Sequence, residues 1–219
     1  MEYQIKFEIG TVNTLIIESP SLMRSFVEQL SNQIKGKEGG FVLSENSEEL
    51  IISKNIELIL NPFIDSSYAT KFTSRLSANI KNCAVDEKLY QKTAEMQSLL
   101  LEFASILAHE CNEPIIFADE IDLTALIKLL GFAYDFEDSF LENIVTYLLA
   151  VNTYFKTNIF VFANLKSYLQ KEELAYLFEV TKSNNCHLIL IENRLYESFI
   201  KEEKYCIIDK DLCEIFSEG

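Results

Sequence analysis

Two continuous apolar runs near the C-terminus constrain the fold of this chain more than any other feature. They are NIFVFA at 158–163 and HLILI at 187–191, and such runs are typical of strands that are buried on both faces of a sheet. Between them, residues 171–182 carry apolar side chains at helical spacing. The order strand, helix, strand predicts two parallel strands joined by a right-handed crossover.

The N-terminal part of the chain extends the same pattern. Ser19-Pro20 is an N-cap followed by proline at the first helical position, so a helix is expected after the apolar run 14–17. Further strands are predicted at 3–9, 41–43, 49–52, 56–60, 204–208 and 212–216. The fold class is therefore α/β, with residues 1–61 and 155–219 forming one discontinuous sheet domain.

Residues 62–154 are expected to form an inserted all-helical domain. Helices are predicted at 66–82, 87–110, 122–130 and 138–155, with a short strand at 132–134. In the helix 87–110 an apolar stripe follows a 4-3-4-3-4 spacing through Leu89, Thr93, Met96, Leu100, Phe103 and Leu107. This spacing fits a core helix of one chain and a helix that packs against partner helices equally well.

Composition excludes several classes of protein. An apolar content of 48% fits a globular fold, and no run reaches the length of a membrane span. The five cysteines form no CxxC motif, which argues against a disulfide framework and a zinc site. The N-terminus does not resemble a signal peptide, so we expect a cytoplasmic protein without membrane contact.

Charge is sorted along the chain, whose net charge is −15. Residues 67–92 hold five basic side chains and two acidic ones, whereas residues 102–142 hold ten acidic side chains and one lysine. This contrast fits either a polyanion-binding surface beside a cation-binding surface or an ordinary solvated exterior. An acidic chain normally avoids nucleic acid, so DNA binding would need its positive charge to be concentrated locally.

The basic side chains include two pairs at a spacing of four, Lys71 with Arg75 and Lys88 with Lys92, which predicts that each pair shares a helix face. Such faces can contact a phosphate backbone without reading bases. In the acidic zone, the loop from Glu113 to Asp122 offers hard oxygen ligands of the kind that calcium prefers, although no DxDxDG loop is present. Helix N-terminal acids that face water are the alternative.

The chain lacks the motifs of nucleotide hydrolysis and of common hydrolases. The turn after 14–17 contains Glu18 and no glycine or lysine, where a phosphate-binding loop would need both. Asn164 follows the strand 158–163, where a magnesium-binding acid would be expected. His109-Glu110-Cys111 does not extend to HExxH. We therefore expect a protein that is not an enzyme.

The segments FADEIDLTALIKLLGF (117–132), NIFVFANLKSYLQKEELAYLFEV (158–180) and HLILIENRLYESF (187–199), together with the domain layout, resemble the CRISPR-associated spacer-acquisition family specific to type II-A systems. The resemblance implies a head domain similar to P-loop ATPases but lacking their nucleotide motifs, with an inserted helical leg. It also implies a calcium-stabilised homotetrameric ring that binds free ends of double-stranded DNA without sequence preference. The CRISPR integrase proteins and the RNA-guided nuclease are the implied partners.

Under this resemblance, two sets of residues are candidates for binding. The DNA contacts would be Lys71, Arg75, Lys81, Lys88 and Lys92, and the Ca²⁺ ligands would be Glu110, Glu113, Asp119, Glu120 and Asp122. Two other functions remain open. One is a degenerate nucleotide-binding-fold regulatory subunit that recruits a protein partner without binding DNA, and the other is a metal-dependent nuclease that uses the acidic cluster.

Overall fold

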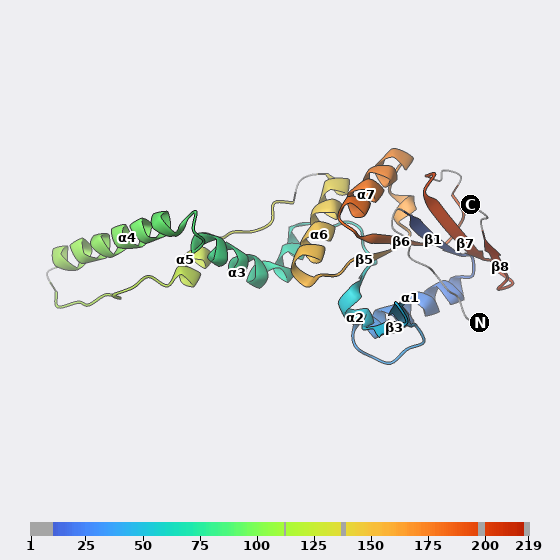
Figure 1. The fold of residues 1–219 in the computed structure, drawn as a ribbon, viewed down its shortest axis with the longest axis horizontal. Coiled ribbons are helices and arrows are strands. Elements are labelled where there is room, and N and C mark those ends of the chain that lie inside the picture. Colours follow the sequence, from blue (N-terminus) through green and yellow to red (C-terminus); the bar gives the residue numbers. More distant parts are fainter. Residues whose placement is uncertain (1–10, 112, 137–138, 197–199, 217–219) are drawn as a thin grey trace. The chain divides into compact units, whose positions relative to one another are not determined.

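A six-stranded sheet built from both ends of the chain organises the fold (Figure 1). Its strands, in spatial order, are β4 (Ile56–Ile59), β5 (Ile159–Ala163), β6 (His187–Glu192), β1 (Val12–Ile17), β7 (Glu203–Ile208) and β8 (Glu214–Phe216). Strands β4 to β7 pair in parallel, and β8 pairs antiparallel with β7. The predicted strand–helix–strand unit is confirmed, because β5 and β6 are neighbours and α7 (Lys171–Ser183) lies between them in sequence.

The structure, a computed structural model, describes residues 11–111, 113–136, 139–196 and 200–216, so the strand expected at 3–9 lies outside the described residues. The chain divides into a head unit, Met1–Asp65 with Phe136–Gly219, and a helical unit, Ser66–Asp135. Helix α6 (Phe140–Phe155) lies in the head unit, whereas the sequence placed it in the inserted domain. The reason is that α6 packs against α7 and buries seven of its side chains.

Helices cover both faces of the head sheet. One core cluster joins alternate residues of the strands, such as Leu15 and Val161, to Leu30 of α1 (Pro20–Ile34). The intervening residues, such as Phe160 and Leu190, have no exposed area. Burial on both faces explains why these strands read as continuous apolar runs.

Local sequence sets the element ends in the head unit. The Ser19 hydroxyl accepts a hydrogen bond from the Leu22 N–H at 3.5 Å, and Pro20 occupies the first turn of α1. The strands expected at 41–43 and 49–52 form a shifted hairpin, β2 (Leu43–Glu45) and β3 (Glu48–Leu50), followed by α2 (Ile52–Asn55). The shift arises because Asn46 and Ser47 both adopt positive φ and close a two-residue turn.

The helical unit contains η1 (Ser66–Lys71), α3 (Thr73–Ala84), α4 (Tyr90–Glu110) and α5 (Leu123–Leu129). Helix α3 packs against α5, and the buried ring of Phe72 meets the ring of Tyr134 with centroids 5.6 Å apart. The strand expected at 132–134 is absent, because this segment packs through Tyr134 instead of pairing with another strand. Within the described ranges, no helix is both long and apolar enough to cross a membrane.

Candidate nucleic-acid interface and metal site

The five candidate DNA contacts are all exposed and lie in the helical unit. Lys71 ends η1, Arg75 and Lys81 lie on α3, and Lys92 lies on α4. Lys88 lies in the turn before α4, so it does not share a helix face with Lys92 as the spacing predicted.

The turn at Asp86 explains this difference. The Asp86 carbonyl accepts hydrogen bonds from the N–H groups of Leu89 and Tyr90, at 3.0 and 2.8 Å, and its side chain accepts one from the Glu87 N–H at 2.7 Å. The turn separates α3 from α4 and delays the start of α4 from residue 87 to residue 90. Side chains of Ser, Asp and Asn commonly compete with helices in this way.

The five candidate metal ligands are exposed as well, and two of them line a common cavity. Glu110 is the last residue of α4, and Glu113 and Asp119 lie in the extended segment that follows. Glu120 and Asp122 line one pocket just before α5. Within the described ranges, no three His, Cys, Asp or Glu side chains are grouped closely enough to hold a metal ion. The five-carboxylate site therefore stays a prediction.

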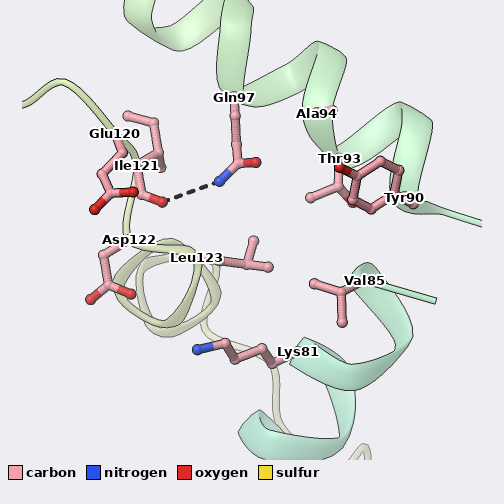
Figure 2. A pocket seen from close by; sticks show the side chains of 10 residues that line it. All are labelled: Lys81, Val85, Tyr90, Thr93, Ala94, Gln97, Glu120, Ile121, Asp122 and Leu123. Atoms are coloured by element: carbon pink, nitrogen blue, oxygen red, sulfur yellow. Dashed lines mark hydrogen bonds between the residues drawn. The ribbon is translucent and has the colours of Figure 1, made fainter.

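This pocket has a volume of about 500 Å³ and lies entirely within the helical unit (Figure 2). Its residues come from α3, α4, the intervening turn, the segment before α5 and the first residue of α5: Lys81, Val85, Tyr90, Thr93, Ala94, Gln97, Glu120, Ile121, Asp122 and Leu123. The Gln97 side chain donates a hydrogen bond to the Ile121 carbonyl at 3.1 Å, which ties α4 to this segment. A predicted DNA contact, Lys81, thus shares a pocket with two predicted metal ligands.

Asp122 is the N-cap of α5, and its carboxylate accepts a hydrogen bond from the Thr124 N–H at 2.8 Å. This hydrogen bond is the main reason why the pKa of Asp122 lies below its usual value, and the positive charge of Lys81 lowers the pKa further. Lys81 itself donates to the Thr124 hydroxyl at 3.0 Å. Gln97 and Thr124 were not identified from the sequence, because polar residues at helix starts and on exposed helix faces carry no distinctive signal.

The head unit has a cleft of its own, with a volume of about 490 Å³, at the carboxyl ends of parallel strands. Ligands of open α/β sheets bind in this position. Here, however, Glu18 lines the cleft together with Pro20 and Asn164, in agreement with the missing phosphate loop. A phosphate at this cleft would meet a carboxylate and a proline, which has no N–H to offer.

Comparisons with known proteins agree with one another. The family of CRISPR-associated proteins described as Cas_Csn2 matches residues 33–212. CRISPR-associated protein Csn2 of Streptococcus agalactiae is 27% identical over 136 residues, which cover 58% of this chain and 62% of that protein. The chain thus matches less than two thirds of the length of this relative. The crystal structure of Stu0660 of Streptococcus thermophilus shares the fold, with a TM-score of 0.56 at 11% identity, over 93% of this chain and 71% of that one.

Proposed function

The chain belongs to the Csn2 family of CRISPR-associated proteins, and we propose that it binds free ends of double-stranded DNA during spacer acquisition, without sequence preference and without catalysis. The observation that carries this proposal is that residues 67–92 of an acidic chain hold five basic side chains and two acidic ones, and that all five basic side chains are exposed on the helical unit. Lysine contacts to phosphates supply affinity but no sequence information. The CRISPR integrase proteins and the RNA-guided nuclease of the same system are the protein partners that we propose.

A homotetrameric ring is the second part of the proposal. The helical unit exposes many large apolar side chains, among them Leu99, Phe103, Ile106, Ile116, Leu129 and Leu130, with exposed fractions between 53% and 97%. Exposed apolar surface of this extent is characteristic of an association surface. Four copies would also place four basic regions around one lumen, so that the DNA is attracted locally although each chain is acidic.

Calcium is the proposed stabilising ion. Carboxylate oxygens are the ligands that calcium prefers, and Glu120 and Asp122 already line one pocket of the helical unit. Glu110, Glu113 and Asp119, the remaining candidates, lie on the segment between α4 and that pocket. Bound calcium would neutralise carboxylates that otherwise repel one another and the DNA.

The head unit is proposed to be a P-loop-ATPase-like fold that has lost nucleotide chemistry. Two features support this. The interior strand β1 leads directly into α1 at the carboxyl edge of a mainly parallel sheet, where nucleotide hydrolases hold phosphates. At this position the chain has Glu18, Ser19 and Pro20 in place of glycines and a lysine.

Charge reversal of Lys88 and Lys92 tests the DNA interface. Both side chains are exposed, and neither takes part in a hydrogen bond or ion pair within the described ranges, so their replacement disturbs no intramolecular contact. We expect Lys88→Glu with Lys92→Glu to weaken binding of a linear duplex at least about tenfold. The slope of log K against log salt should also fall by about 0.9 for each phosphate that the variant no longer neutralises.

The matched control is Lys171→Glu with Lys210→Glu, which makes the same charge change at exposed positions of the head unit. Fluorescence anisotropy with two unrelated duplex sequences measures affinity and sequence preference together. An equal loss of affinity in both variants would contradict the assignment to the helical unit. Absence of duplex binding by the unmodified protein would favour the protein-recruiting function, and DNA cleavage with magnesium or manganese would favour the nuclease.

A further inference from the structure

Three ionisable side chains are buried together on one face of the head sheet. Glu192 ends β6 and Glu203 begins β7, and neither side chain has exposed area, while Lys166 of η2 (Leu165–Ser167) is 8% exposed. In the strand register, Glu203 lies beside Val12 and Glu192 beside Ile16 of β1. Because alternate residues of a strand share a face, both carboxyl groups project from the same side of the sheet.

The contacts within this cluster are unequal. The Lys166 ammonium lies 2.5 Å from Oε1 of Glu203, and the Thr14 hydroxyl donates to the same oxygen. Glu192 has no such side-chain contact, and its Oε1 accepts the backbone N–H of Lys166 at 3.0 Å. The second oxygens of Glu192 and Glu203 are buried and have no hydrogen-bond partner within the described ranges.

One ammonium group thus faces two carboxyl groups away from water. The direct contact assigns the Lys166 charge to Glu203, so Glu192 would carry a negative charge that no cation of the described residues compensates at contact distance. A buried carboxyl in this position takes up a proton instead of remaining ionised. We propose that Glu192 is a proton-binding site of the head unit, at which a neutral carboxylic acid lies beside the Lys166–Glu203 ion pair and anchors the turn after β5.

The titration properties of Glu192 agree with this geometry. Burial raises the pKa of Glu192 to about 7, and the nearby charge of Glu203 acts in the same direction. The backbone N–H groups of Lys166 and Leu165 and the ammonium of Lys166 oppose the rise but do not cancel it. The described charged groups that act on Glu192 are therefore Lys166 of η2 and Glu203 of β7. The Thr14 hydroxyl of β1 acts on Glu203.

The proposal fixes the sign of a pH dependence. A carboxyl whose pKa is higher in the folded state than its ordinary value of 4.5 binds its proton more tightly when the protein is folded. Its stabilising contribution is complete below pH 4.5 and is lost as the pH rises to about 7. Within this window the unfolding constant should increase by up to about tenfold per pH unit because of this one group.

Glu192→Gln tests the proposal, since glutamine imitates the neutral acid. We expect its unfolding constant to match that of the unmodified chain near pH 4 and to be at least about tenfold smaller near pH 8. Denaturant unfolding of the full chain, followed by circular dichroism, measures this difference. Glu202→Gln, at the exposed position that precedes Glu203 in the sequence, is the control and should keep the original pH dependence. An unchanged pH dependence in Glu192→Gln would overturn the proposal.

A second measurement does not depend on the folding of that variant. In the unmodified protein, labelled with ¹³C at the glutamate carboxyl carbons, one resonance should titrate near neutral pH. Glu203→Gln should move this resonance to lower pH, because it removes the negative charge that helps to raise the pKa of Glu192. If every glutamate of the folded chain ionises below about pH 5.5, Glu192 is not a proton-binding site.

Discussion

Lys81, Glu120 and Asp122 line a single pocket, although the sequence assigned them to two different ligands. The positive charge of Lys81 already helps to keep Asp122 ionised, through the lowered pKa of that carboxyl group. A divalent cation at Asp122 would repel the ammonium of Lys81. We therefore expect metal binding at Asp122 and phosphate contact by Lys81 to influence one another, because both side chains line the same pocket.

Removal of two carboxylate charges from the pocket tests the calcium site. Asp122→Asn preserves an N-cap residue for α5, and Glu120→Gln preserves size, so the double variant should fold. In the unmodified chain, calcium at about 100 times its Kd should add about 2.7 kcal/mol of stability and raise Tm by roughly 5 to 10 °C. The double variant should lose most of this rise.

Thermal unfolding with calcium and with chelator measures this response. Glu87→Gln with Glu102→Gln removes the same charge from exposed positions of the helical unit that lie outside the candidate set, and should respond as the unmodified chain does. If the pocket variant and this control respond equally to calcium, the ion binds elsewhere or not at all.

At the scale of single residues, sequence identified charge but not its surroundings. All five basic and all five acidic candidates are exposed, as expected for groups that bind ligands in solution. The displacement of Lys88 from a helix face could not be foreseen, because it depends on hydrogen bonds at Asp86. The cluster around Glu192 was also missed, since an acid after an apolar run normally marks the exposed end of a strand.

Among the elements, α4 decides between the two interpretations that its spacing allowed, a core helix of one chain and a helix that packs against partner helices. None of its residues is buried in the single chain, and Leu100, Phe103 and Leu107 of its stripe are 37%, 58% and 48% exposed. The interpretation as a core helix of one chain is therefore wrong. Association with partner helices remains, and it agrees with the spacing of the stripe.

Introducing charged residues into the apolar stripe of α4 should disrupt assembly without disrupting the fold of the single chain. We expect Phe103→Glu with Leu107→Glu to leave the helix content unchanged, because neither side chain is buried in the single chain. In solution the mass should fall from about four chains to one chain of 25.2 kDa, since buried charges at an interface are strongly unfavourable. Light scattering after size-exclusion chromatography measures the mass, and circular dichroism measures the helix content.

Ser98→Glu with Ser105→Glu is the matched control for this pair, since it adds the same charge to the same helix. Ser98 and Ser105 are also exposed, and helical geometry places both on the side of α4 opposite the stripe. This variant should keep the mass of the unmodified protein. A stripe variant that retained the full assembly mass would mean that α4 does not contribute to the interface.

The predictions of helices and strands were accurate where the signal is local in sequence and failed where it depends on contacts with distant segments. The strands β5 and β6 and helices α1 and α7 were predicted to within a few residues, because burial and N-caps mark them locally. The assignment of α6 to the inserted domain failed because an amphipathic pattern shows that a helix packs but not against what. The segment 132–134 failed as a strand because strand formation requires a partner strand elsewhere in the chain.

At the scale of the whole molecule, the head unit and the helical unit carry different kinds of surface and site. The head unit has a closed core, a cleft without a phosphate loop and a buried proton-binding cluster. The helical unit carries the basic candidates, the acidic candidates and the exposed apolar surface. The proposed DNA interface therefore uses a local basic stretch, residues 67–92, of a chain whose net charge is −15.

The most direct test of the account compares one covalently closed circular duplex with the same molecule cut once to make it linear. A gel-shift measurement with calcium and with chelator keeps sequence and length constant, so that only the free ends differ. A ring that loads at ends should bind the linear form, more tightly with calcium, and leave the closed circle unbound. Equal binding to both forms would contradict loading at ends, and binding to neither would contradict the DNA function itself.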